Sequence, residues 1–192
     1  MKYVIVSLIL AIAIQNQMLS QEESTLSKKE QKQLAKEKRQ AEKAARDERA
    51  KEITRLMLEH HKFVLEANYI SDGKGHRQPV SSNLNFLALD STEATLQLGS
   101  PWGIGINGVG GITVDGRVSK YELVVHEGKK GNSYTVTMFI MTSLGTYDIN
   151  MWITESGRAD ATVRGSVSGQ LTYSGELIPL SLSKVYKATS IP

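Results

Sequence analysis

The sequence contains no cysteine, and among its 192 residues it has only four histidines and two tryptophans. Without cysteine the chain forms no disulfide bond, no thiolate metal site, no cysteine nucleophile and no lipid-modified N-terminal cysteine. The histidines follow no spacing of a metal-binding motif; they are His60, His61, His76 and His126. We therefore expect neither a metal site nor a cofactor.

Charge of one sign is also lacking in the larger part of the chain. From residue 63 to the end there are ten Lys or Arg and eleven Asp or Glu, so the formal net charge of +3 arises nearer the N-terminus. A surface that binds nucleic acid needs clustered basic side chains to neutralise phosphates. The sequence accordingly argues against nucleic acid as a partner.

Hydrophobic runs long enough to span a membrane are missing as well. The longest apolar run extends from Tyr3 to Ile14 and follows Lys2. Its length of about 12 residues falls short of the roughly 20 that a spanning helix needs, and it is typical of a secretory signal peptide. We predict a signal peptide over residues 1–20 and an exported protein. In the alternative, the segment stays uncleaved and holds the protein close to the membrane.

Charged residues that favour helices are abundant, and they follow a short linker at residues 21–27. Residues 28–61 contain no Gly or Pro and are rich in Ala, Lys, Glu, Arg and Gln. Ser27 and Glu30 have the spacing of a capping box, which predicts a helix start. Apolar side chains share one face only near the end of this segment, so we expect only its last two turns to dock on the next domain. Because heptad spacing is poor, a stiff charged spacer is favoured over a coiled coil.

From residue 62 to residue 192 the hydrophobic period changes to two, which indicates half-buried strands. Asp115-Gly116 is typical of a tight turn, so we predict a hairpin over Ile112–Val118. The apolar positions from Leu171 to Leu182 predict one or two closing strands. Eight to ten short strands without intervening helices predict a single, mainly β, antiparallel domain that is either a sandwich or a barrel.

A glycine-rich segment, GSPWGIGINGVGG at residues 99–111, contains the spacing G-x-G-x-x-G. A dinucleotide site needs a helix N-terminus directly after these glycines, because the helix end holds the pyrophosphate. The residues that follow read as a strand, so we expect a loop and not a nucleotide site. Trp102 either anchors this loop in the core or faces a ligand, and Gly103 and Asn107 are candidate contacts for a ligand or partner.

A second aromatic residue lies on a strand face that the alternation predicts to be exposed to solvent. Trp152 shares this face with Asp148 and Asn150, so it either marks a binding surface or packs beneath a loop. No catalytic motif accompanies it, because the S-x-x-K spacing at residues 181–184 lacks its companion motif and lies in a strand-rich tail. We therefore expect a protein that is not an enzyme.

Three short motifs, in this order, resemble the bacterial domain of unknown function 4251 (DUF4251). They are Pro101-Trp102 before the glycine loop, Gly111 within it, and Tyr173-Ser174-Gly175 near the end of the chain. The resemblance covers about residues 63–178. Since family members are small exported proteins of Bacteroidetes, it implies a β-rich domain and export to the periplasm or cell envelope of a Gram-negative bacterium. It implies no particular activity.

Three functional hypotheses follow. The first is a non-enzymatic envelope protein whose β-domain, carried on the helical spacer, binds a protein, a glycan or another surface partner. The second is a lipocalin-like carrier of a small apolar ligand, with Trp102 and the glycine loop at the rim. The third is a hydrolase whose Ser, His and Asp side chains converge only in space.

Overall fold

The computed structural model describes residues 27–99, 108, 110–129, 131–165 and 169–190. Helix α2 (Lys28–Glu59) begins where the capping box predicts. The Ser27 amide donates to the Glu30 carboxylate at 2.8 Å, and the Glu30 amide donates to the Ser27 hydroxyl at 3.4 Å. The helix ends at Glu59, just before the predicted end, because His61 takes a positive φ of 55° as the chain turns into the first strand.

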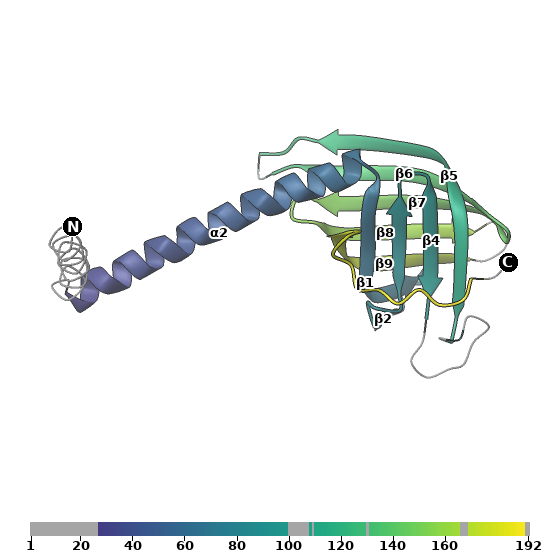
Figure 1. Cartoon of the computed structure of the whole chain (residues 1–192), viewed down its shortest axis with the longest axis horizontal. Coiled ribbons are helices and arrows are strands. Elements are labelled where there is room, and N and C mark those ends of the chain that lie inside the picture. The colour runs from purple at the N-terminus through teal and green to yellow at the C-terminus, as the bar shows by residue number, and fades with distance from the viewer. Residues whose placement is uncertain (1–26, 100–107, 109, 130, 166–168, 191–192) are drawn as a thin grey trace, which may run out of the picture. The chain divides into compact units, whose positions relative to one another are not determined.

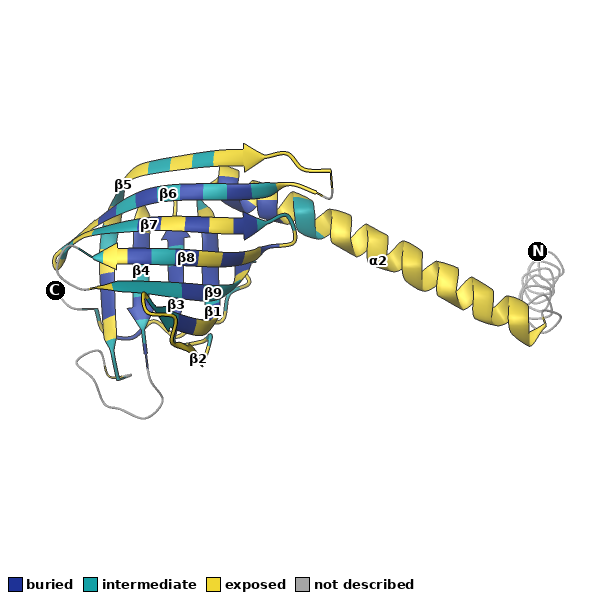
Figure 2. Cartoon of the chain, turned by 180° about the vertical axis from the view of Figure 1, so that it is seen from behind, coloured by how far each residue is buried: buried dark blue, intermediate teal, exposed yellow. Residues whose placement is uncertain are grey.

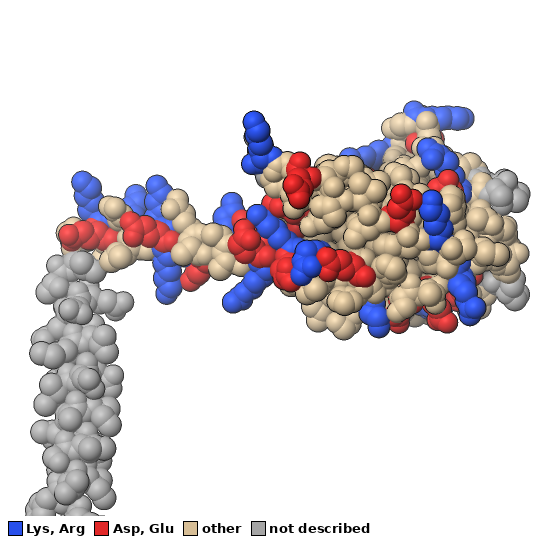
Figure 3. Space-filling view, turned by 90° about the horizontal axis from the view of Figure 1, so that it is seen from above, with Lys and Arg blue, Asp and Glu red and all other residues tan. Residues whose placement is uncertain are grey.

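Most of α2 is solvated. Residues 28–49 are exposed, and basic and acidic side chains are interspersed along the helix (Figure 3). Burial is confined to the last turns, at Thr54, Met57 and Leu58. The chain divides into two compact units, residues 1–46 and 47–192. The prediction that only the end of the helix docks is confirmed, although Ile53 and Leu56 of the expected apolar face remain exposed and Leu58 is buried instead. These last turns belong to the same unit as the strands.

Nine strands follow α2 in the described part of the chain, and each neighbouring pair is antiparallel. They are β1 (Lys62–Asp72), β2 (Arg77–Pro79), β3 (Phe86–Asp90), β4 (Glu93–Leu98), β5 (Ile112–His126), β6 (Ser133–Thr142), β7 (Gly145–Thr154), β8 (Arg158–Gly165) and β9 (Gln170–Pro179). Pairing of β1 with β9 closes eight of them into a barrel, and β2 adds an extra strand beside β1 (Figure 1). The predicted antiparallel β fold is confirmed, and of its two forms it is the barrel.

The predicted hairpin at Asp115-Gly116 is wrong, because β5 runs without a turn through both residues. Gly116 is instead the point at which β5 changes partners: it pairs with Ala94 of β4 and with Thr142 of β6. A Cβ atom at this position would lie 2.6 Å from the Met141 carbonyl oxygen. Glycine is therefore needed for a close approach of two backbones inside a strand, and not for a turn.

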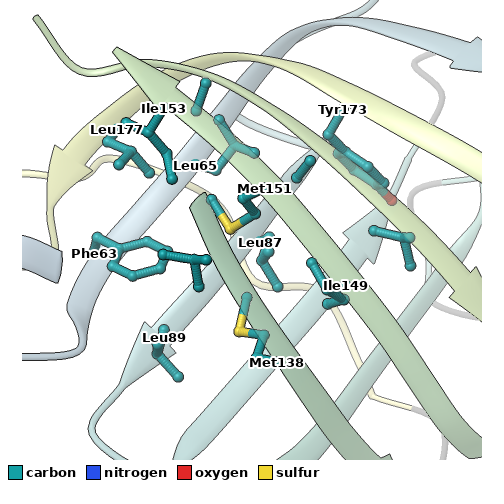
Figure 4. Close-up of a cluster of buried hydrophobic side chains, with 14 of the residues drawn as sticks. Phe63, Leu65, Leu87, Leu89, Met138, Ile149, Met151, Ile153, Tyr173 and Leu177 are labelled. Carbon is teal, nitrogen blue, oxygen red and sulfur yellow. The ribbon is translucent and has the colours of Figure 1, made fainter. Parts of the chain in front are cut away.

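The barrel interior is filled by the apolar residues of the alternating pattern (Figure 4). Phe63, Leu65, Met138, Ile149 and Met151 are all essentially inaccessible to solvent. Side chains of this size each stabilise the fold by roughly 1.5–3 kcal/mol when they are fully buried. Period-two alternation therefore located the core correctly on β6 and β7. On β1 it holds from Phe63 to Ala67, but the prediction that Tyr69 shares this inner face is wrong, because a bulge between Ala67 and Tyr69 turns Tyr69 outward.

The C-terminal tail, residues 180–190, forms no strand in the described structure. The prediction that Leu182 belongs to a closing strand is wrong: β9 ends at Pro179, and Leu182 remains 67% exposed. The tail instead crosses the outer faces of β1, β3, β4 and β5 (Figure 1). It thus covers the outside of the barrel wall.

Gln97 fixes the tail to this outer face. Its side chain is inaccessible to solvent although it points away from the barrel interior, because the tail lies over it. Gln97 Nε2 donates to the Tyr186 carbonyl at 2.8 Å, and the Ala188 amide donates to Gln97 Oε1 at 2.8 Å. Between these two residues, Lys187 Nζ lies 2.8 Å from the Asp115 carboxylate. The tail is therefore held by both hydrogen bonds and an ion pair.

Candidate ligand site at one end of the barrel

The last turn of α2 covers one end of the barrel, which we call the helix end. Leu58 is fully buried there, and its carbonyl oxygen accepts a hydrogen bond from the Tyr121 hydroxyl at 2.9 Å. The Tyr121 ring packs against His61, with 3.8 Å between ring centroids. Burial raises the pKa of Tyr121 well above its usual value, so its hydroxyl stays neutral and remains a donor at physiological pH.

The opposite end, which we call the cavity end, contains a cavity of about 220 Å³. Strands β4 and β8 end there, and β5, β7 and β9 begin there. The described lining is mostly apolar and carries no charged side chain: it consists of Leu96, Leu98, Ile112, Val114, Tyr147, Val163, Gly165, Gly169, Gln170, Leu171 and Tyr173. An apolar cavity of this size favours an apolar guest over water.

Three polar side chains contribute to the lining. Tyr173 is buried and donates to the Gln97 carbonyl oxygen at 3.3 Å, and burial raises its pKa, so this hydroxyl is neutral and already occupied. Gln170 accepts a hydrogen bond from Arg164 Nε at 3.0 Å. The Tyr147 hydroxyl has no hydrogen-bond partner among the described residues. Tyr147 is therefore the lining group best placed to bond a polar atom of a guest.

The residues predicted as contacts fall in two places. Trp102, Gly103 and Asn107 lie outside the described residues. Trp152 lies on β7 with its side chain 49% exposed, while its neighbour Met151 points into the core. The structure therefore does not bring Trp152 to the cavity.

The cavity residues were not predicted as a site from the sequence. Alternation places Tyr147 and Tyr173 on inner strand faces, which the structure confirms. It does not reveal that the ends of five strands meet around one space, because that depends on the pairing order of the closed barrel. No local signal could have found this site.

The glycine segment leads into a strand, as predicted. Gly108 takes a positive φ of 78°, and the chain then enters β5. The helix N-terminus on which a dinucleotide site depends is thus replaced by a strand.

One histidine–carboxylate pair appears in the described structure, at the turn between β1 and β2. His76 Nδ1 lies 2.8 Å from the Asp72 carboxylate, and Asp72 also accepts the backbone amides of Lys74 and His76. The hydrogen bond from the His76 side chain, followed by these amides, lowers the pKa of Asp72. The His76 side chain is 83% exposed, so the pair orders a surface turn and does not line the cavity.

Among the described residues, no group of three or more His, Asp or Glu is arranged to hold a metal ion. No described helix combines the length and the apolar composition that crossing a bilayer requires.

The geometry defines a class: an eight-stranded antiparallel barrel with a helix over one end and an apolar cavity at the other. The chain belongs to the DUF4251 family, since residues 45–177 match the model of that domain of unknown function. It is similar to the crystal structure of a DUF4251 family protein from Bacteroides eggerthii DSM 20697, with 29% sequence identity and a TM-score of 0.57. That match covers 70% of this chain and 90% of the other. A search of curated proteins found no match.

The family match begins inside α2, at residue 45, and so includes the turns of the helix that dock on the barrel. The Tyr173-Ser174-Gly175 motif also acquires a structural role. Tyr173 fills the core, and a Cβ atom at position 175 would collide with the Glu66 carbonyl oxygen, where β1 carries a bulge. This motif therefore supports barrel closure between β1 and β9.

Proposed function

We propose that this chain is a binding protein whose barrel takes up a small apolar ligand at the cavity end. The observation that carries the proposal is the apolar cavity of about 220 Å³ in an eight-stranded barrel. Barrels of this strand number have an interior wide enough to hold one small ligand. A cavity of about 150 Å³ accommodates benzene, so the present one suits a guest of on the order of ten carbon atoms.

The lining also supports binding over catalysis. Its described members offer tyrosine hydroxyls and one amide, and no side chain that would serve as nucleophile and base together. Burying about 250 Å² of apolar ligand surface yields roughly 6 kcal/mol before the cost of association. We therefore expect dissociation constants of about tens of micromolar or weaker.

We further propose that the protein is exported to the periplasm or cell envelope and that the exposed part of α2 acts as a spacer. This proposal is supported by the sequence of residues 1–20 and by the exposure of residues 28–49. A second candidate function is the display of the barrel to a partner at the envelope. The long solvated helix favours it, because such a helix provides reach and no core.

The first proposal can be tested with 2-naphthol, a fluorescent ligand of suitable size. Titration into the full chain should give saturable binding. Val163→Phe, which fills part of the cavity from β8, should weaken binding at least tenfold. Thr162→Phe changes the adjacent outward-facing position and should leave it unchanged. Absence of binding to the wild-type chain, or equal loss in both folded variants, would contradict the proposal.

A further inference from the structure

A second hollow lies on the outside of the barrel, away from the cavity. It has a volume of about 490 Å³ and lies over β7, β8, β9, β1 and β2, which run side by side (Figure 2). The pairing register aligns four of its outward-facing residues in one row across the strands. Trp152 is opposite Asp160, Asp160 is opposite Ser174, and Ser174 is opposite Tyr69. We call this row and its flanking side chains the outer groove.

Exposed aromatic rings stand at the two ends of the row. Trp152 is 49% exposed and Tyr69 is 42% exposed, which is unusual for side chains of this size. The Arg77 guanidinium lies 4.2 Å from the centre of the Tyr69 ring and covers one of its two faces. Three strand spacings separate the two ends, or about 14 Å. This distance matches the length of an extended ligand of two to three rings.

Polar side chains occupy the space between the aromatic rings. Asp160 and Ser174 lie in the row itself, and Asn68 lines the hollow beside Tyr69. Arg158 and Glu176 are opposite each other in the neighbouring row of β8 and β9. The two arginines and two carboxylates of the groove cancel, so the groove offers many hydrogen-bonding groups without a net charge.

Two kinds of ligand are disfavoured by this arrangement. A polyanion such as a nucleic acid needs an excess of positive charge, which the groove lacks. A peptide that adds to a sheet needs a free strand edge. Of the strands beneath the groove, β7, β8, β9 and β1 are each paired on both sides, and in the described structure β2 presents a free edge of only three residues.

From these observations we infer that the outer groove binds an uncharged oligosaccharide of two to three sugar units. The apolar face of a sugar ring stacks on an exposed indole or phenol ring, as in other contacts with aromatic faces. Its hydroxyl groups donate to the Asp160 carboxylate and exchange hydrogen bonds with Ser174 and Asn68. This inference does not depend on the cavity inside the barrel, because the groove is built from outward-facing side chains.

The test uses the full chain with Trp102→Phe, so that Trp152 is the single fluorescent tryptophan. Cellotriose, maltotriose and chitotriose serve as uncharged probes, trigalacturonate as the acidic probe, and the peptide acetyl-(Ala-Ser)3-amide as the extended-chain probe. At least one uncharged trisaccharide should change Trp152 fluorescence saturably, with a dissociation constant below about 10 mM. An affinity of this order is expected for a few stacking and hydrogen-bond contacts.

Variants then locate the binding by calorimetry. Trp152→Ala and Tyr69→Ala should each weaken it at least fivefold, whereas Tyr186→Ala, which removes an aromatic ring exposed elsewhere, should not. The inference is overturned if no uncharged trisaccharide binds, if trigalacturonate or the peptide binds more tightly, or if binding survives both groove variants.

Discussion

The two ends of the barrel are held by different parts of the chain. At the helix end, α2 inserts Leu58 against the core and bonds Tyr121 through a backbone carbonyl. At the cavity end the support comes from outside the barrel, where the backbone of the tail forms hydrogen bonds with the Gln97 side chain of β4. The residues on either side of Gln97, Leu96 and Leu98, line the cavity. Because the tail supports the cavity end from outside the barrel, the interior there has room for a guest. At the helix end, Leu58 packs inside the barrel and leaves no such room.

The largest expected effect comes from truncating Leu58, the side chain that packs into the helix end. Leu58→Ala should lower the free energy of unfolding by about 2–5 kcal/mol, because a fully buried leucine leaves a cavity in a packed site. Leu56→Ala, on the exposed face of the same helix, should change it by less than about 0.5 kcal/mol. Urea denaturation of the full chain measures both. Equal effects would show that the helix end is not packed as described.

The next effect concerns the external support of the cavity end. Gln97→Ala leaves the Tyr186 carbonyl and the Ala188 amide without their partner, which should cost about 1–3 kcal/mol. Trypsin should also cleave the tail faster, at Lys184 and Lys187. Gln78→Ala removes an exposed glutamine on β2 and serves as the matched control. Unchanged proteolysis in Gln97→Ala would mean that the tail is held by other contacts.

A smaller effect should distinguish the polar from the apolar part of the guest. Tyr147→Phe removes the lining hydroxyl that has no partner among the described residues. Affinity for 2-naphthol should fall by about 0.5–1.5 kcal/mol, whereas affinity for naphthalene should stay the same. Fluorescence titrations of the two ligands give this difference directly. A similar loss for both would place Tyr147 in a packing role only.

The smallest effect is the pH dependence of the tail contact. Partial burial opposes ionisation of Asp115, but hydrogen bonds from Lys187, Ser190 and Thr95 outweigh it and lower the pKa of this carboxyl. A lowered folded-state pKa means that the contribution is complete above the unfolded-state value of about 3.9 and is lost as the pH falls through the folded-state value. The stability difference between wild type and Asp115→Asn should therefore shrink below about pH 4. A difference that stays constant down to pH 2 would contradict this assignment.

Local patterns predicted the parts of the fold that depend on neighbouring residues. Ser27 and Glu30 located the start of α2, and the alternation on β6 and β7 placed Met138 and Met151 inside. The prediction at Gly116 is wrong because a glycine required by the close approach of a neighbouring strand can have the same local sequence as a glycine in a turn. The sequence motif cannot distinguish these two uses.

Features that depend on pairing between strands far apart in the sequence could not be predicted from local patterns. Closure by β1 and β9 joins residues more than a hundred positions apart, such as Phe63 and Pro179. The cavity follows from that closure, and so does the row from Trp152 to Tyr69. Trp152 nevertheless stands out in the sequence, because a large aromatic residue on a solvent-facing side of a strand breaks the alternation. The cavity residues broke no pattern and gave no such signal.

The contrast between the two ends is tested most directly by methyl NMR of the full chain titrated with naphthalene. We predict chemical-shift changes at the methyl groups of Leu96, Val114 and Val163, which line the cavity, and none at Leu58 and Leu89 near the helix end. Shifts concentrated at Leu58 and Leu89, or no shifts at saturating naphthalene, would contradict the account.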